Sequence, residues 1–159
     1  MNNGWISEVF KNTRGIRQGC PLSALLFVLS VEIMASRLRS NTDFKGIRVK
    51  LDCKKHTIKI SQLADDTTLF CCSKYDVQVA MNEIKIFGSH SGLKLNRNKT
   101  EGLWVGKLKS CKDKIEGINW SNGPVKTLGI YFGHCREECE KLNWENKIEK
   151  MNKLFCSWQ

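Results

Sequence analysis

The chain has 159 residues, enough for one domain with a buried core, and 41% of them are hydrophobic. No stretch is expected to span a membrane, and the first twelve residues lack the apolar core of a secretory signal. We therefore expect an intracellular protein, in the nucleus or cytoplasm. The net charge of +10 favours polyanionic partners, nucleic acid first and an acidic membrane surface second.

The N-terminal part is predicted to form a short strand over residues 5–10 and then a basic loop from Arg14 to Gly19. A helix follows, with Ser23 expected as its N-cap and Arg37 and Arg39 suited to its C-terminal end. Apolar residues recur in it at helical spacing. They predict a buried stripe made of Leu22, Leu25, Leu26, Leu29 and Ile33.

Two strands are predicted next, over Gly46–Leu51 and His56–Gln62, with a polar turn at Asp52–Lys55 between them. The preceding helix is expected to pack under the sheet that these strands begin.

Basic residues are concentrated in two segments. Lys45–Ile60 carries six lysines and arginines against one acid, and Lys94–Lys114 carries seven against two.

Between these basic segments lies an acidic centre with two adjacent aspartates, Asp65 and Asp66. β-prone residues flank them on both sides, and aspartate tolerates the unusual backbone angles of a tight turn. The sequence therefore predicts a hairpin with two carboxylates at its tip. Two like charges so close repel each other, and a divalent cation such as Mg²⁺ removes that penalty. A solvated turn without a ligand is the alternative interpretation.

The second half of the chain is predicted to begin with a helix capped by Ser73, in a sequence that resembles a capping box and ends near Gly88 or Gly92. Its core-facing residues are Val77, Ala80, Met81, Ile84 and Phe87. Short strands are expected over residues 103–105, 118–120 and 125–132. In the last of these Leu128, Ile130 and Phe132 should face one way.

A final helix is predicted from about Glu137 to the end of the sequence. One stripe of this helix contains Trp144, Ile148, Met151, Phe155 and Trp158. Core packing is the favoured interpretation of this stripe, with base stacking by Trp144 and Trp158 as the alternative. The eight cysteines are read as reduced thiols. A zinc site at His134, Cys135 and Cys139 is disfavoured because a second ligand pair is missing. These elements predict an α+β fold with a mostly antiparallel sheet.

Four sequence segments, in this order, closely resemble the reverse transcriptases of non-LTR (LINE-type) retrotransposons. They are TRGIRQGCPLSALLF from Thr13, ADD from Ala64, SGLKLNRNKT from Ser91 and VKTLGIYFG from Val125. They correspond to the family's motifs B, C, D and E. Two positions depart from the family pattern. Leu63 replaces the usual Tyr or Phe before ADD, and Ala24 replaces a common Pro.

The resemblance implies most of a polymerase palm over residues 1–133 and the start of a helical thumb over 134–159. It implies Mg²⁺-dependent addition of dNTPs to a DNA primer on an RNA template, with Mn²⁺ as a possible substitute and no membrane partner. Asp65 matches the metal ligand of motif C, and Asp66 matches the second carboxylate, which has a positioning role.

The resemblance also assigns roles outside the aspartate pair. Motif B implies template and nucleotide contact by Arg14, Gly15, Arg17, Gln18 and Gly19, although a basic surface loop is the alternative. Lys99 of motif D would either protonate the leaving pyrophosphate or only steer phosphate. Motif E implies a primer grip at Leu128, Gly129 and Ile130, with a plain core strand as the alternative.

The family's motif A, which carries a further aspartate, is expected before motif B. Only Glu8 is acidic among the first thirteen residues. The interpretation is therefore a fragment that needs the fingers and motif A of the remaining polymerase for activity. The alternatives are a non-catalytic, basic nucleic-acid-binding remnant and a degenerate element without function.

Overall fold

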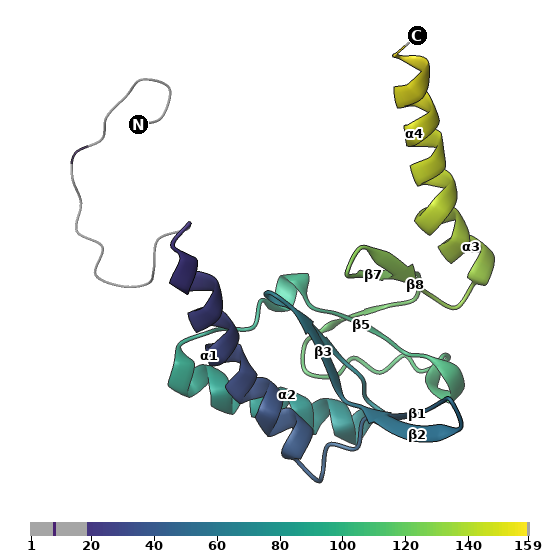
Figure 1. The fold of residues 1–159 in the computed structure, drawn as a ribbon. Coiled ribbons are helices and arrows are strands. Elements are labelled where there is room, and N and C mark those ends of the chain that lie inside the picture. The colour runs from purple at the N-terminus through teal and green to yellow at the C-terminus, as the bar shows by residue number, and fades with distance from the viewer. Residues whose placement is uncertain (1–7, 9–18, 159) are drawn as a thin grey trace.

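The computed structural model describes residue 8 and residues 19–158 of the chain. The strand expected over residues 5–10 and the motif B residues Arg14, Gly15, Arg17 and Gln18 therefore lie outside the described residues. Figure 1 shows two helices against one end of a set of short strands, with a further helix leading away from the strands to the C-terminus.

The elements follow one another as helix, four strands, helix, four strands and a final helical stretch. In chain order they are α1 (Pro21–Ser40), β1 (Ile47–Leu51), β2 (Lys54–Ile58), β3 (Ile60–Leu63), β4 (Asp66–Leu69), α2 (Lys74–Ser91), η1 (Arg97–Lys99), β5 (Glu101–Leu103), η2 (Gly106–Leu108), β6 (Asn119–Ser121), β7 (Val125–Thr127), β8 (Ile130–Phe132), α3 (Arg136–Glu140), the π-helical η3 (Lys141–Glu145) and α4 (Asn146–Cys156).

Within the described residues the strands form four pairs rather than one continuous sheet. The pairs β1–β2, β3–β4 and β7–β8 are antiparallel, and β5–β6 is parallel. The α+β prediction is confirmed. Two predicted strands were wrong in detail, because His56–Gln62 is interrupted at Lys59 and 125–132 folds back on itself. Within 125–132 the chain reverses at Leu128 and Gly129, which have φ angles of 49° and 81°.

The main core joins α1, α2 and the β3–β4 hairpin. Its buried residues are Met34, Leu38, Phe44, Ala80 and Phe87, and Ile60 of β3 and Leu69 of β4 pack against them. The expected packing of α1 beneath the aspartate hairpin is therefore confirmed for the C-terminal half of the helix. The core residues of α2 are also those that the sequence predicts, with Ile84 partly buried.

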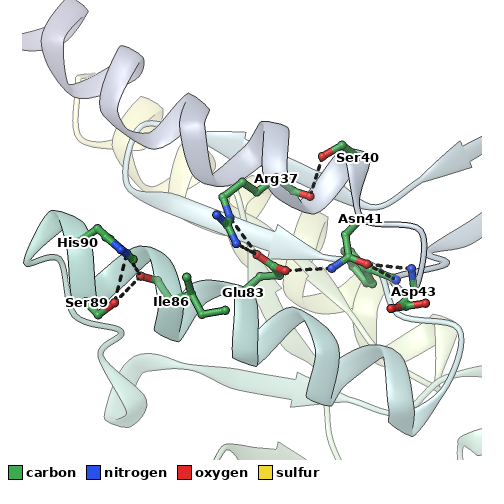
Figure 2. Close-up of polar contacts among 9 residues, drawn as sticks. Arg37, Ser40, Asn41, Asp43, Glu83, Ile86, Ser89 and His90 are labelled. Atoms are coloured by element: carbon green, nitrogen blue, oxygen red, sulfur yellow. Dashed lines mark hydrogen bonds and ion pairs between the residues drawn. The ribbon is translucent and has the colours of Figure 1, made fainter.

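A polar cluster holds α1 against α2 (Figure 2). Arg37 Nε and Nη2 donate to Glu83 Oε2 over 3.0 and 2.8 Å, and Asn41 Nδ2 donates to Glu83 Oε1 over 3.0 Å. Asn41 Oδ1 accepts from the backbone amides of Asp43 and Phe44, which turns the chain out of the helix. Glu83 is thus the acceptor that fixes the distance between the two helices.

The first turns of α1 depart from the expected stripe. Leu22, Leu25 and Leu29 have exposed fractions of 61%, 63% and 64%, and Leu26 and Ile33 are exposed as well. The helix extends past α2 and the strands, as Figure 1 shows, so no described residue covers these turns. The predicted burial of this stripe was wrong. The periodicity shows how the apolar residues are spaced along the helix, but it does not show whether other residues pack against them.

The start of α1 also differs from the prediction. The helix begins at Pro21 with Cys20 as its N-cap, and Ser23 lies inside the first turn. Proline fixes φ near the helical value and is favoured at the first helical position, so the helix starts earlier than a serine cap would place it.

By length and composition alone α1 is long and apolar enough to cross a membrane. The expectation that no stretch of the chain is long and apolar enough to do so was therefore wrong. Its C-terminal half, however, supplies Met34 and Leu38 to the core and Arg37 to the ion pair with Glu83. These contacts place that half inside the folded domain. A core helix with an apolar extension passes the same test of length and composition.

Helix α2 begins with the predicted cap, since the Ser73 hydroxyl accepts from the Asp76 amide over 3.1 Å. The expected capping box is only half formed. The Asp76 carboxylate reaches instead to the backbone amides of Cys72, Lys45 and Gly46 at 3.0 to 3.2 Å. The helix ends at Gly92, which adopts the left-handed conformation predicted for it.

A second core lies under β5 and β6. Trp104 and Trp120 stack with their ring centroids 4.0 Å apart and their planes 5° from parallel. Gly102 leaves the space for this layer, because a Cβ there would lie 2.6 Å from the Trp120 ring. Val77 and Met81 of α2 complete the buried cluster with Ile118, so α2 joins both cores.

The final helical stretch contacts the strands through one amide. Asn143 Oδ1 accepts from the Tyr131 amide over 2.7 Å, and Asn143 Nδ2 donates to the Tyr131 carbonyl over 2.9 Å. The side chain thus pairs with β8 as another strand would. The stripe on this helix is exposed, from 53% at Met151 to 82% at Trp158, so core packing was the wrong interpretation for the described chain.

Candidate functional site: a carboxylate hairpin beside a second hairpin

The two aspartates lie at the tip of the predicted hairpin. Strand β3 pairs with β4 so that Leu63 faces Asp66, and the two-residue turn consists of Ala64 and Asp65. Ala64 has a φ of 52°, the strained position of the turn. Both carboxylates are exposed to solvent. The predicted hairpin is confirmed, and its tip presents two anionic groups next to each other.

The base of this hairpin is rigid although its tip is exposed. Ile60 and Leu69, which face each other across the pair, pack on the main core. The Phe70 amide donates to the Lys59 carbonyl over 2.9 Å and extends the ladder below them. The carboxylates therefore stand on two strands fixed by burial, which limits how far they can move relative to the core.

A second hairpin, β7–β8, lies beside the first. The hydroxyls of Thr68 on β4 and Thr127 on β7 share a hydrogen bond of 2.7 Å. Thr68 is two residues along the strand from Asp66, so this bond joins the carboxylate hairpin to its neighbour. Segments that are far apart in sequence are therefore in direct contact at the site.

An open, mostly apolar groove of about 230 Å³ lies between the two hairpins. Its walls are Ser61, Thr68 and Phe70 from the first hairpin and Thr127, Leu128, Ile130 and Phe132 from the second. Leu128, Ile130 and Phe132 all line this groove, although the single strand on which they were predicted to face one way is broken at Leu128. Gly129 lies at the turn of β7–β8, where an added Cβ would meet no atom within 4 Å.

The remaining predicted site residues, Lys99 and Gly19, make no hydrogen bond or ion pair with the aspartate pair in the described part of the chain. Lys99 ends η1, and its backbone amide donates to Asn96 Oδ1 over 3.3 Å. Its side chain is exposed and makes no hydrogen bond or ion pair with Asp65 or Asp66 in the described part of the chain. Gly19 is the motif B residue that the structure describes; it is exposed, with a φ of 87°.

The hairpin tip offers part of the donor set that a metal ion requires. Asp65 and Asp66 offer hard carboxylate oxygens, the donors that Mg²⁺ prefers, and Mg²⁺ commonly takes one or two carboxylates together with substrate phosphates. Among residues 8 and 19–158 no group of three or more His, Cys, Asp or Glu side chains comes together. The pair fits as part of a Mg²⁺ site. The described cysteines are free thiols.

Sequence reasoning missed the threonine pair and the aromatic wall of the groove. The sequence marks Thr68 and Phe70 only as β-prone residues beside the aspartates, and it does not single out Thr127. The available signal was alternation: Thr68 in β4 and Phe70 just after it are two residues apart, and a β-branched hydroxyl often pairs with another across strands. That the partner would come from residue 127 depends on tertiary packing.

The comparisons with known proteins agree with these segments. Residues 1–132 match the family described as reverse transcriptase (RNA-dependent DNA polymerase). The transposon TX1 uncharacterized 149 kDa protein of Xenopus laevis is 31% identical over 121 residues, which cover 75% of this chain and 9% of that protein. The retrovirus-related Pol polyprotein from the type-2 retrotransposable element R2DM of Drosophila melanogaster is 36% identical over 97 residues, 61% of this chain and 8% of that protein. The chain thus spans less than a tenth of the length of these relatives.

Proposed function

This chain belongs to the reverse transcriptase family, and from that premise we propose that it forms part of the palm of a non-LTR retrotransposon RNA-directed DNA polymerase. Residues 1–133 are assigned to the palm and 134–159 to the start of the thumb. The reaction is Mg²⁺-dependent addition of dNTPs to a primer 3′-hydroxyl on an RNA template.

One observation carries this proposal. The carboxylate hairpin β3–β4 and the hairpin β7–β8 are bonded through Thr68 and Thr127 and form one groove. A polymerase must hold the primer terminus close to the carboxylates that bind its metal ions. Two hairpins in direct contact, one carrying Asp65 and Asp66 and the other matching motif E, give that arrangement a physical basis.

Each predicted site residue has a proposed role in the reaction. Asp65 and Asp66 would hold Mg²⁺, with Mn²⁺ as a substitute. A bound divalent cation supplies charge neutralisation at the triphosphate and a lower pKa for the primer hydroxyl. Leu128, Gly129 and Ile130 form the wall against which the primer lies. Lys99 either steers phosphate or protonates the leaving pyrophosphate.

We further propose that the 159 residues do not extend a primer unaided. The support is that the family's motif A lies before motif B, and no aspartate precedes Asp43 among these 159 residues. Two carboxylates on one turn cannot by themselves fix two cations at the ~4 Å separation of two-metal sites. The fingers and motif A must come from the rest of the polymerase.

The test combines metal binding with activity. The isolated chain should bind Mn²⁺ weakly at the hairpin, seen as paramagnetic broadening of the Asp65 and Asp66 amide resonances, and Asp65→Ala should remove the broadening. Asp43→Ala is a matched control, because Asp43 is also an exposed aspartate but lies away from the hairpin. Broadening that is centred elsewhere would contradict the site.

For activity, the fingers and motif A of an intact relative are joined to this chain. Template-dependent primer extension should appear in the chimera, should be lost with Asp65→Ala and should be kept with Asp43→Ala. Extension by the 159 residues alone would contradict the missing-carboxylate argument. A chimera that stays active without the Asp65 carboxylate would remove that residue from the metal site.

A second candidate is nucleic-acid binding without catalysis. The observation that favours it is the exposure of all seven lysines and arginines between Lys94 and Lys114. Such a segment attracts a phosphate backbone whether or not the carboxylates are active. The chimera distinguishes the two candidates. If it bound nucleic acid but did not extend a primer, only the proposal of binding without catalysis would be supported.

A further inference from the structure

The β1–β2 hairpin has two chemically different faces, because successive side chains of a strand point to opposite sides. One face is half-buried at its base, where it presents Ile47, Val49 and Ile58. The other face is exposed and carries three cations, Arg48, Lys50 and Lys55. This second face is called the basic face below.

Two cations of the basic face lie directly opposite each other, since Lys50 pairs with Lys55 in the register. The turn residues Asp52 and Cys53 have φ angles of 49° and 64°, as in a type I′ turn, which closes on a hydrogen-bonded pair. The next pair, Lys50 and Lys55, is then of the non-hydrogen-bonded kind, in which side chains lie closest. Like charges in this position destabilise a hairpin, so the arrangement does not serve the fold.

No acid neutralises the basic face. Across residue 8 and residues 19–158, its three cations make no ion pair and no side-chain hydrogen bond. Lys59, just after β2, differs, because its Nζ donates to the carbonyls of Arg39 and Asn41 over 2.8 and 2.7 Å. The base of the hairpin is fixed as well, since the Gly46 amide donates to Asp76 Oδ2 over 3.0 Å. The basic face is therefore an uncompensated charge on an anchored support.

We propose that the basic face holds the phosphate backbone of the template–primer duplex, away from the groove between the other two hairpins. This inference rests on the proposed function, which supplies the duplex. A polyanion between Lys50 and Lys55 removes the repulsion that the hairpin otherwise bears. Backbone contacts of this kind position a nucleic acid without reading its sequence.

The composition of the face favours a duplex over the other polyanions. A duplex carries one charge per about 1.7 Å of its axis, against about 3.4 Å for one strand, so three clustered cations meet more phosphates on it. The face offers no aromatic ring on which the bases of a single strand could stack. It also lacks the apolar side chains with which a basic surface enters a lipid membrane.

The basic face lies at the far end of the chain segment that leads to the carboxylates. Only Lys59 separates β2 from β3, and Figure 1 shows the two hairpins pointing in opposite directions. The ten residues from Lys55 to Asp65 span at most about 34 Å in extended conformation. A duplex that rises about 3.4 Å per base pair covers this span in about ten base pairs. One duplex of moderate length can therefore contact both places.

The test measures binding of an RNA–DNA hybrid of about 20 base pairs by fluorescence anisotropy, in EDTA so that no metal ion sits at Asp65 and Asp66. The double variant Lys50→Gln, Lys55→Gln should lower the slope of log K against log salt by roughly 2, at about 0.9 for each contact. Its loss of affinity between about 50 and 200 mM salt should then be about tenfold smaller.

A matched control removes the same charge elsewhere. Lys54 is exposed on the opposite face of the same hairpin, next in sequence to Lys55, and Lys85 is exposed on α2. The variant Lys54→Gln, Lys85→Gln should leave the slope nearly unchanged. Equal effects of the two double variants would overturn the proposal, because they would show a response to net charge alone.

Thermal unfolding without nucleic acid separates binding from folding. The variant without Lys50 and Lys55 should melt at the same temperature as the unchanged chain or higher, because like charges no longer face each other. A lower melting temperature would show that the fold itself uses these lysines, and would overturn the proposal. Circular dichroism follows the melting.

Other ligands give distinct outcomes. Single-stranded RNA of the same length should show a smaller difference between the two double variants than the hybrid does. A larger difference with the single strand, or with vesicles of anionic lipid, would assign the face to that ligand and overturn the proposal. The result is also independent of catalysis. A slope lowered only by the basic-face variant would support this inference even if the chimera extended no primer, and an active chimera with an unchanged slope would overturn this inference alone.

Discussion

Asp76 is fully buried, yet it is not part of the candidate site. Burial alone would raise the pKa of this carboxyl group. The backbone amides of Cys72, Lys45 and Gly46 donate to it, and they outweigh burial so that the pKa lies below its usual value. Asp76 therefore acts as a structural anion that ties the start of α2 to the segment before β1.

The first prediction concerns this anion. Asp76→Asn should lower the free energy of unfolding at pH 7 by about 1–3 kcal/mol, because the amide replaces a charged acceptor of backbone hydrogen bonds. Since the folded pKa is depressed, the contribution of Asp76 is present above the unfolded pKa and is lost as pH falls through the folded value. Urea denaturation should show that the free energies of unfolding of the unchanged protein and of the Asp76→Asn variant differ at neutral pH and become equal at acidic pH. Asp43→Asn, at an exposed site, should leave stability unchanged, and a constant difference down to low pH would contradict the argument.

The second prediction concerns Cys71, a thiol next to this anion. Burial, together with the charges of Asp76 and Cys72, raises its pKa to about 12. At pH 8 such a thiol is almost entirely protonated, and the thiolate is the reactive form. Alkylation followed by mass spectrometry should therefore find Cys71 modified at least a hundredfold more slowly than the exposed Cys53. The difference should vanish in urea, and equal rates in the folded protein would contradict the burial and the raised pKa of Cys71.

At the scale of elements, the contact between α1 and α2 depends on Glu83. Its side chain is 14% exposed and accepts from both Arg37 and Asn41 (Figure 2). The ion pair Arg39–Glu32, within α1 alone, has both partners about half exposed. The two pairs have the same chemistry but different burial, so they form a matched comparison.

The third prediction is a pair of double-mutant cycles with alanine. Arg37 and Glu83 should couple by about 1 kcal/mol, because the carboxylate is partly desolvated and two Arg37 nitrogens donate to its Oε2. Arg39 and Glu32 should couple by no more than a few tenths of a kcal/mol, as exposed pairs do. The free energies come from chemical denaturation. A coupling of equal size in both cycles would mean that burial at the helix contact does not matter.

Elements were predictable from sequence where local rules decide them. Ser73 and Gly92 bound α2 as capping chemistry requires, and the turn before Asp66 forms where aspartates favour it. The reversal at Leu128 was missed because leucine seldom adopts a positive φ, so that Gly129 was the one local sign of a turn in an otherwise β-prone stretch. The contact of Thr68 with Thr127 and the exposure of the α1 stripe depend on how distant segments pack, which periodicity does not contain.

For the whole molecule, we expect the exposed apolar turns of α1 to limit the solubility. Leu25 and Leu29 are both more than 60% exposed, and contiguous apolar surface of this kind promotes association. The fourth prediction is that Leu25→Lys with Leu29→Lys raises the solubility of the chain several-fold. Ser30→Lys with Ser36→Lys adds the same charge without removing apolar surface, and should help much less. Solubility is measured as the protein left in solution after concentration and centrifugation. An equal gain in both variants would assign the effect to charge.

The fifth prediction concerns the net charge of +10. Binding of single-stranded nucleic acid should weaken steeply with salt, because each phosphate contact releases counterions. Replacing Lys109, Lys112 and Lys114 by glutamine should reduce the slope of log K against log salt by roughly 2, at about 0.7 for each contact. Replacing Lys147, Lys150 and Lys153 on the C-terminal helix should leave the slope nearly unchanged. Fluorescence anisotropy gives the constants, and a slope that is insensitive to the first set would place binding elsewhere.

The stacked layer of Trp104 and Trp120 also gives the protein an optical property. Two indole rings 4.0 Å apart and nearly parallel are close enough for their electronic transitions to couple, so the pair absorbs and rotates ultraviolet light differently from two separate rings. The coupling exists only while β5 and β6 hold the rings together above Gly102. The circular dichroism of the unlabelled chain therefore contains a contribution from this region, which can be isolated as the difference between the chain and its Trp120→Phe variant and followed as the protein unfolds.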